Sequence, residues 1–427
     1  MPRRCGPTSP LCSYALPPEL TLTIMQAMDK PSLEASTRVC RNWLALGRPY
    51  LFESVAYAAP RKVDQVPLAD LVAFLHVSPH VCNFVSRLAL RLGDATALLR
   101  PDGHRTRCTL PTLAAALRCL PRLSTLTVDC FPLQCSDDAT GAPPLARLAS
   151  LRISGWYSPP ARTSCPNGAA HFLELFAEID ELSLGPGVHF PEAPTTLGPS
   201  NVPRVHSLSV ESASILRGLP ATMSLASLER LTLPVLTADS IAAARTVLAA
   251  ASHSLQHLAL DVHIPSIGPP TSDGGLHFLR ALVLGTLPAL ATLTLVLPVY
   301  GLSAADAAPR CARDGPVGLS FWAPAHTFVA GLVPELPQST HTLRLALHFV
   351  SRDPALAFFR REWWDWRAYP MHAGWADLHD ALAARATHGI RHVEFANALG
   401  GLIPESEQRA IMKDTPLLWE NGLACFV

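Results

Sequence analysis

The sequence carries no excess of either charge. Its 427 residues include 34 Lys and Arg and 34 Asp and Glu, so the formal net charge is zero. Proteins that bind nucleic acid or anionic membranes through electrostatics carry a clustered excess of basic residues. We therefore expect neither partner. Charged residues make up only 16% of the chain and hydrophobic residues 49%, which predicts a large buried core instead of disorder.

The sequence also lacks the short motifs on which many enzyme sites are built. It contains no G-x-S-x-G nucleophile elbow and no glycine-rich loop of the G-x-x-x-x-G-K-[ST] or G-x-G-x-x-G type. His253 and His257 are four residues apart, but the chain between them passes from helix towards strand, so we expect no shared metal. These absences predict a non-catalytic protein with no catalytic residues, no metal and no cofactor.

Cysteine is scattered, and no targeting segment is visible. The eleven Cys are odd in number and include no C-x-x-C pair, and the first 20 residues contain no continuous apolar stretch of the kind found in secretory signals. Because disulfides persist mainly in oxidising compartments, we expect reduced thiols in a cytoplasmic and/or nuclear protein. Residues 281–305 carry no charge, but Pro288 and Pro298 favour a buried strand over a membrane span.

Residues 16–55 have the pattern of two or three short helices. One apolar stripe recurs every four residues, at Leu20, Ile24 and Met28. Residues 29–31 should end this first helix, and Ser32 can cap the next. We expect Gly47 and Pro49 to end the last helix. About 40 residues are too few for a self-sufficient core, so these helices must pack against something else.

This stretch resembles the F-box family. The family motif begins Leu-Pro-x-Glu-Leu, continues with an Ile and a Leu, and ends Val-Cys-x-x-Trp. The matching positions here are Leu16, Pro17, Glu19, Leu20, Ile24, Leu33, Val39, Cys40 and Trp43. Met28 stands where Leu is common and Ser32 where Asp is frequent, and both keep the physical character of the position. The alternative is an unrelated helical cap on the larger domain.

The resemblance implies a partner for these helices. An F-box docks on a Skp-family adaptor, and the adaptor bridges to a cullin. The residues that would form or support the adaptor-binding face are Leu16, Pro17, Leu20, Ile24, Leu33, Val39, Cys40 and Trp43. On this interpretation residues 14–57 are the F-box, and residues 1–13 are a disordered N-terminus.

The rest of the chain repeats the pattern L-x-x-L-x-x-L-x-L. Its anchor positions lie 23–31 residues apart, at Leu126, Leu151, Leu182, Leu208, Leu231 and Leu258. This spacing is near the period of leucine-rich repeats, and L-x-L suits the inward residues of a short strand. The helices expected between the strands are Thr112–Leu120, Ala169–Ile179, Thr237–Ala251, Gly274–Leu284 and Trp375–His388.

The predicted fold class is therefore α/β. A small N-terminal helical F-box is followed, over residues 58–427, by an irregular leucine-rich-repeat-like solenoid of parallel strands and helices. Each strand–helix unit has two apolar faces and cannot bury both alone, so neighbouring units should stack. The repeats resemble the divergent leucine-rich repeats of many F-box proteins. An ordinary α/β domain with a parallel sheet shares the same alternation and is the alternative.

Aromatic residues cluster between Phe358 and Tyr369, outside the repeats. Trp363, Trp364 and Trp366 are candidate client-binding residues, since Trp, Tyr and Arg are enriched at interface hot spots. The other interpretation is that these rings seal the open end of the array.

Together these features predict a substrate receptor of an SCF-type ubiquitin ligase. The helices would bind the Skp-family adaptor, and through it a cullin, while the repeats hold a protein client of unknown identity. Such a receptor is not an enzyme and acts by raising the effective concentration of its client. The alternative is a non-enzymatic interaction scaffold that uses the F-box outside a ubiquitin ligase.

Overall fold

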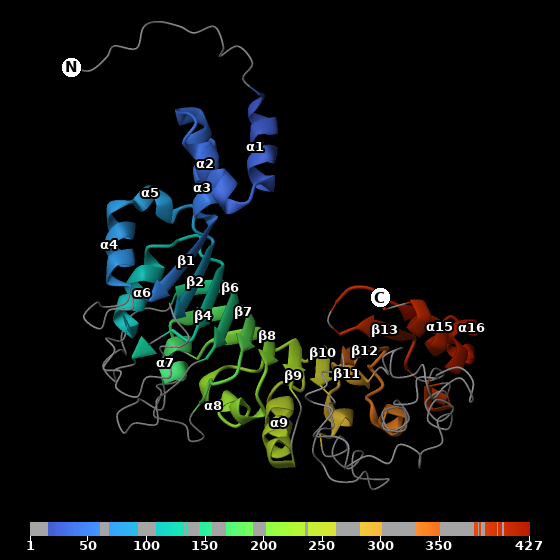
Figure 1. The fold of residues 1–427 in the computed structure, drawn as a ribbon. Helices are drawn as coiled ribbons and strands as arrows, with labels where there is room; N and C mark the ends of the chain where they lie inside the picture. Colours follow the sequence, from blue (N-terminus) through green and yellow to red (C-terminus); the bar gives the residue numbers. More distant parts are fainter. Residues whose placement is uncertain are drawn as a thin grey trace, which may run out of the picture. The chain divides into compact units, whose positions relative to one another are not determined.

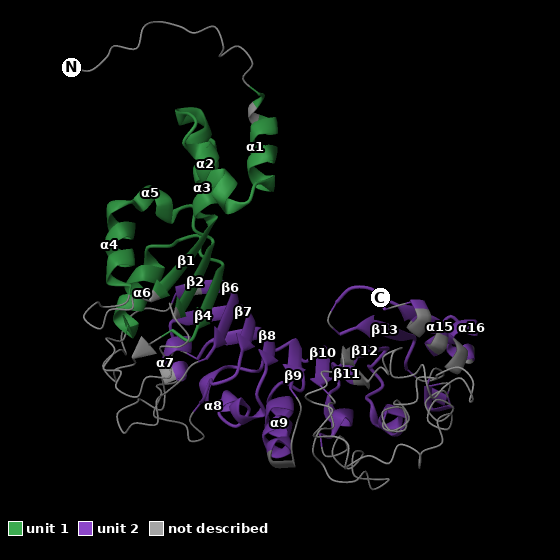
Figure 2. Cartoon of the chain, in the orientation of Figure 1, with its two compact units in different colours: residues 1–140 green, residues 141–427 purple. Residues whose placement is uncertain are grey.

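The chain forms two compact units, residues 1–140 and residues 141–427, in the computed structural model (Figure 2). The structure describes residues 16–59, 68–92, 108–131, 133–134, 145–155, 168–190, 202–234, 238–261, 282–300, 329–350, 380–382, 384–385, 389–398, 400–403 and 405–427. Both units are α/β, and every strand pair described within either unit is parallel.

The first unit begins with three helices and continues with strands (Figure 1). Its elements are α1 (Pro18–Ala27), α2 (Lys30–Thr37), α3 (Arg41–Glu53), β1 (Ser54–Ala59), α4 (Ala69–Val77), α5 (Pro79–Cys82), β2 (Arg87–Leu92), β3 (Cys108–Thr109), α6 (Leu110–Arg118), β4 (Thr125–Asp129) and β5 (Leu133–Gln134). Strands β1, β2 and β4 lie side by side in that order, and β3 pairs with β5. The predicted helix Thr112–Leu120 is confirmed as α6.

Tyr57 ties the start of α4 to strand β1. Its hydroxyl donates to Asp70 Oδ1 at 2.8 Å and accepts from the Leu68 backbone N–H at 2.9 Å. Leu68 is fully buried and has a φ of 69°, a left-handed conformation that costs a non-glycine residue energy. The hydrogen bond and the burial together offset that cost and fix where the helix begins.

The second unit contributes nine of the described strands, which neighbour one another in chain order. Its elements are β6 (Leu145–Ser154), α7 (Gly168–Leu173), β7 (Phe176–Leu184), β8 (Arg204–Val210), η4 (Ala213–Ile215), α8 (Leu219–Thr222), β9 (Arg230–Leu233), α9 (Ala238–Ala250), β10 (His257–Asp261), η5 (Leu284–Thr286), β11 (Thr292–Tyr300), η6 (Val333–Glu335), β12 (Thr342–Val350), β13 (His392–Asn397), α15 (Glu405–Asp414), α16 (Pro416–Glu420) and β14 (Ala424–Phe426). A doubly wound sheet reverses its strand order. The strictly sequential order here is compatible with an α/β solenoid.

One row of buried side chains runs across these strands and is called the leucine row below. Its members are Cα partners on successive strands: Leu151, Leu182, Leu208, Leu231, Leu258, Leu293, Leu343 and Val393. All eight are essentially inaccessible to solvent. The predicted inward, parallel placement of the anchor leucines is therefore confirmed in this unit. Leu126 is likewise buried, beside its partner Leu88 in the first unit.

Helices cover one side of the strands. Figure 1 shows α8 and α9 on the same side of the second unit's strands, and these two helices pack on each other. The predicted helix Thr237–Ala251 is confirmed as α9, which buries Ala244, Val247 and Leu248. The core therefore lies between the leucine row and the helices, and the alternate strand residues face away from it.

The predicted helix over Ala169–Ile179 is too long. The helix α7 ends at Leu173, and strand β7 begins at Phe176. Phe176 and Ile179 are both buried, as inward residues of that strand. Large aromatic and β-branched side chains pack well on a pleated surface, so the strand replaces the last helical turns.

The charge-free segment contains the predicted strand, β11. Among the described residues, no helix is both long enough and apolar enough to cross a bilayer. The segment Gly274–Leu284 and the segment Trp375–His388 lie mostly outside the described residues, and Trp363, Trp364 and Trp366 lie wholly outside them.

Three other aromatic residues pack together at the last strand. Trp419 on α16 lies 4.6 Å from Phe426 on β14 and 6.0 Å from Phe395 on β13, measured between ring centroids. The Trp419 indole N–H donates to Thr415 Oγ1 at 3.0 Å. These rings hold β14 and α16 against β13, a role that the sequence pattern did not predict for them.

The leucine row predicts a clear contrast in mutational cost. Leu208→Ala and Leu231→Ala should each lower the free energy of unfolding by about 2–5 kcal/mol, because each leaves a cavity in a packed core. Arg204→Ala, at an exposed position on β8, should change it by less than about 0.5 kcal/mol. Urea unfolding of the three variants measures the difference. Equal losses of stability in all three would mean that the wrong residues were assigned to the inward side of the strands.

A second prediction concerns alkaline pH. Burial raises the pKa of the Cys108 thiol to about 12, and burial together with the Asp70 carboxylate raises the pKa of Tyr57 to about 12. The folded protein therefore keeps these protons above the pH at which the unfolded chain loses them. The free energy of unfolding should fall as pH rises from about 9 towards 12. Urea unfolding at several pH values should show a weaker fall for Cys108→Ala and Tyr57→Phe. An identical fall in both variants would contradict this account.

Candidate functional site

The three N-terminal helices form a small bundle in which α1 and α2 both pack on α3. Helix α2 starts at Lys30 because the Asp29 carboxylate accepts a hydrogen bond from the Ser32 backbone N–H at 3.2 Å. Ser32 was expected to be the cap, so this expectation is wrong: Asp29 takes that position. Hydrogen bonds from the Ser32 side chain and backbone lower the pKa of Asp29.

Gly47 brings the helices into close contact. A Cβ atom at this position would lie 2.6 Å from Thr37 Cγ2 and 3.6 Å from both Leu33 Cδ1 and Met25 Sδ. The expectation that Gly47 and Pro49 end the helix is wrong, since α3 continues to Glu53 with Pro49 inside it. Pro49 removes one backbone donor, and the packing of α3 against both neighbouring helices offsets that loss.

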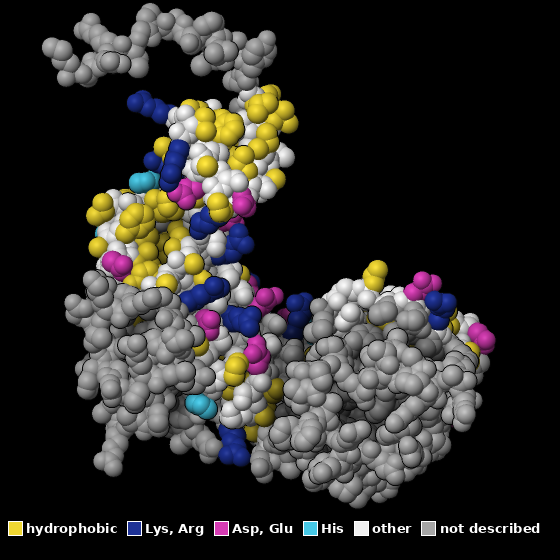
Figure 3. Space-filling model, in the orientation of Figure 1, with side chains coloured by type: hydrophobic (Ala, Val, Ile, Leu, Met, Phe, Trp, Pro, Cys, Tyr) yellow, Lys and Arg dark blue, Asp and Glu magenta, His cyan; other side chains and the backbone are white. Residues whose placement is uncertain are grey.

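The predicted apolar stripe of α1 faces away from the bundle. Thr21 and Met25 are buried, whereas Leu20 keeps 53% and Ile24 40% of its surface exposed. Leu16 is 48% exposed, and Val39, after α2, is 70% exposed. Figure 3 shows hydrophobic side chains gathered over α1. A single exposed apolar side chain is ordinary, whereas Leu16, Leu20 and Ile24 are exposed together on one short segment, an arrangement that marks a candidate interaction surface.

The other predicted adaptor-binding residues divide by exposure. Pro17 and Cys40 are exposed and Trp43 is partly buried, so all three present atoms to solvent. Leu33 is buried against Gly47 and supports the bundle from inside. We call the exposed set Leu16, Leu20 and Ile24 the apolar stripe of the first unit, and Val39 is a separate exposed apolar residue after α2.

A second candidate site is a polar hollow on the second unit. Its lining residues are Arg147, Glu178, Asp180, Glu181, His206, Ser207, Glu229 and Arg230. They come from β6, β7, β8, β9 and the residue before β9. The strand register places Glu181 beside Ser207, and Ser207 beside Arg230. The hollow is therefore built by neighbouring strands whose inward residues are locked in the leucine row.

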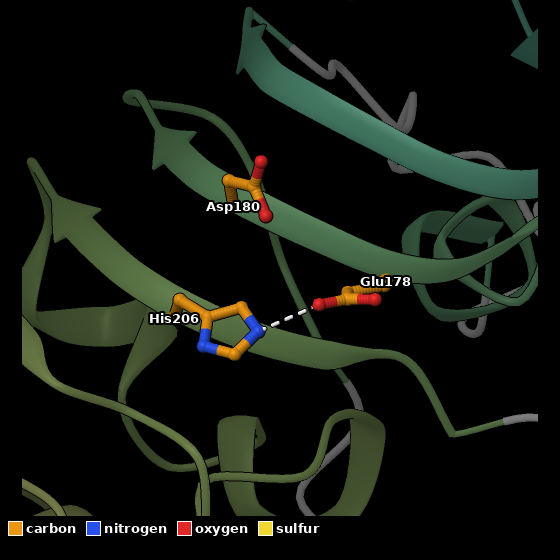
Figure 4. Close-up of side chains that lie close together, drawn as sticks. All are labelled: Glu178, Asp180 and His206. Carbon is orange, nitrogen blue, oxygen red and sulfur yellow. Dashed lines mark hydrogen bonds and ion pairs between the residues drawn. The ribbon is translucent and has the colours of Figure 1, made fainter.

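Two side-chain contacts between neighbouring strands organise the hollow. His206 Nε2 lies 2.8 Å from Glu178 Oε1 (Figure 4). Arg147 holds Asp180 from the neighbouring strand, with its Nη2 at 2.8 Å and its Nε at 2.9 Å from Oδ1. Sequence reasoning missed this set, because Arg147, the pair Glu178 and Asp180, and His206 lie on three different strands and are 26 or more residues apart along the chain.

The comparisons with known proteins give no family assignment. No protein-family model matches the chain, and no curated protein matches it significantly.

The close approach at Gly47 makes a prediction about the bundle. Helix propensity alone would make Gly47→Ala stabilising by about 1 kcal/mol. The 2.6 Å approach to Thr37 Cγ2 should reverse the sign and cost about 1–3 kcal/mol, as overpacking does.

Thr37→Ser removes the methyl group that clashes and serves as the matched control. The double variant Gly47→Ala, Thr37→Ser should recover most of the stability lost by Gly47→Ala. Thermal unfolding of the single and double variants measures both effects. A stabilised Gly47→Ala protein would show that the helices do not meet at this glycine.

Proposed function

We propose that this chain is the substrate-recognition subunit of an SCF-type E3 ubiquitin ligase. The observation that carries the proposal is the outward direction of the apolar stripe. The bundle completes its own core with Thr21, Met25 and Leu33, so Leu20 and Ile24 are available for a partner. These are the positions at which the sequence resembles the adaptor-binding F-box.

The adaptor would cover the apolar stripe. Fully burying an exposed leucine is worth about 1.5–3 kcal/mol. Because Leu16, Leu20 and Ile24 are already about half buried, covering each of them contributes roughly half of that amount to binding. The Skp-family adaptor would then connect the chain to a cullin. The six cysteines that the structure describes are free thiols, which supports a reducing compartment such as the cytoplasm or nucleus.

The second unit would hold the protein client. Its parallel strands, with the spacing of leucine-rich repeats, present successive outward residues on one extended surface, as repeat proteins that bind other proteins do. Trp363, Trp364 and Trp366 stay candidates for client contact. The chain itself breaks no bond, because a substrate receptor acts by holding its client near the ubiquitin-conjugating enzyme.

The test introduces a charge into the apolar stripe. Leu20→Asp should weaken the binding of purified Skp-family adaptor at least about 10-fold, because a carboxylate would have to be buried unpaired. Its melting temperature should hardly change, since Leu20 is 53% exposed in the free chain. Gln26→Glu is the matched control. It adds the same charge to α1 at the side chain that bonds to Tyr50 Oη and should leave adaptor binding intact.

Capture from cells then separates the ligase from its alternative. Wild-type protein should recover both adaptor and cullin, and Leu20→Asp should lose both together. Undiminished adaptor capture by Leu20→Asp would refute the assignment of the adaptor-binding face. Adaptor recovered without cullin would instead favour the interaction scaffold outside a ubiquitin ligase.

A further inference from the structure

Three potential metal ligands converge in the polar hollow. Glu178 and Asp180 on β7 and His206 on β8 each offer one ligand atom, and these atoms all lie within 4.8 Å of one another. Figure 4 shows the His206 ring directed towards Glu178, with Asp180 on the same strand as Glu178. Each of the three side chains is partly exposed, so an ion can reach them from solvent.

From this geometry we propose that Glu178, Asp180 and His206 bind a divalent transition-metal cation of the Zn²⁺ class. One imidazole nitrogen with two carboxylate oxygens is a donor set that zinc accepts, whereas magnesium and calcium prefer oxygen alone. Three protein ligands leave a fourth position for water or for a donor group of a bound partner. No metal site was expected from the sequence, and this proposal departs from that expectation.

The backbone under the site is held in a fixed register. Ile179 pairs with Val205 and Leu182 with Leu208, and all four are buried. The His206 carbonyl also accepts from the Glu229 backbone N–H at 2.8 Å. The strands therefore hold Glu178, Asp180 and His206 in place. Ligand atoms on one zinc lie about 3.5 Å apart, so small side-chain rotations complete the site.

Arg147 orients Asp180, one of the three candidate metal ligands. Carboxylates that bind metals are themselves oriented by hydrogen bonds from neighbouring groups. Arg147 donates to both Asp180 oxygens, with its Nε at 2.9 Å from Oδ1 and 3.1 Å from Oδ2. Each carboxylate oxygen can accept from two directions, so this contact orients Asp180 and leaves it able to bind an ion.

The charge of the hollow favours a cation. Its lining contains four carboxylates, on Glu178, Asp180, Glu181 and Glu229, and two guanidinium groups, on Arg147 and Arg230. With neutral His206 the lining carries two excess negative charges, which one divalent cation balances. Binding through Nε2 places the single proton of the neutral imidazole on Nδ1 and replaces the Glu178–His206 hydrogen bond by two metal–ligand bonds.

The experiment titrates full-length protein with Zn²⁺ by calorimetry and with Co²⁺ by visible absorption. Compared with wild type, His206→Ala should lose one bound ion per chain, and Glu178→Gln should bind that ion at least about 10-fold more weakly. The control is His253→Ala, which removes an exposed imidazole outside the hollow and should bind as wild type does. Thiol sites elsewhere contribute equally to every variant and cancel in the difference.

Equal stoichiometry and affinity in wild type and His206→Ala would overturn the proposal. Glu178→Gln keeps the size and shape of the side chain, so it decides the question even where the alanine variant folds poorly. Circular dichroism of each variant confirms the fold. No adaptor takes part in the titration, so its outcome is independent of the proposed function.

Discussion

The second unit depends on one interaction, in which each strand contributes a buried side chain to a single continuous row. Side chains alternate along a strand, so a shift of one residue in register would turn every inward side chain outward. The leucine row prevents such a shift from Leu151 to Val393, because each member has the next as its partner and all are buried. The fixed register also sets the positions of the side chains that face outward. Glu178, Asp180 and His206 meet because Ile179 and Val205 are fixed beneath them.

The helical bundle of the first unit has far fewer residues from which to form a core. It cannot hold a large core, so it brings its helices close together at Gly47 and fills the space with Met25, Leu33 and Thr37. Because so few residues form this core, Leu20 and Ile24 lie outside it. An apolar stripe facing water costs solvation energy in the free chain, and a partner that covers it recovers that energy. Leu20 and Ile24 are therefore exposed because the bundle has a small core, and the proposed adaptor binding relies on this exposure.

The features predictable from sequence are those with a regular period. The anchor leucines predicted parallel strands and their inward side, and the alanine-rich segment predicted α9. Periodicity alone did not tell which side of α1 is buried: Leu20, Ile24 and Met28 form a regular stripe, yet Thr21 and Met25 fill the core. The cap at Asp29 and the continuation of α3 through Pro49 depend on local hydrogen bonds and tertiary packing that override simple helix signals. The candidate metal-ligand set was missed because His206 lies 26 residues after Asp180 and meets it only through the pairing of β7 with β8.

The central claim is that the apolar stripe of the first unit is covered by a Skp-family adaptor. Hydrogen–deuterium exchange of the full-length chain, with and without purified adaptor, tests it directly. Exchange of backbone amides in residues 16–46 should slow in the complex, because binding removes this surface from water and suppresses local opening of the helices. Peptides from β8 to α9 should exchange at the same rate in both samples and serve as the internal reference. Adaptor that binds elsewhere, or does not bind, would leave residues 16–46 exchanging at their free rate and would contradict the account.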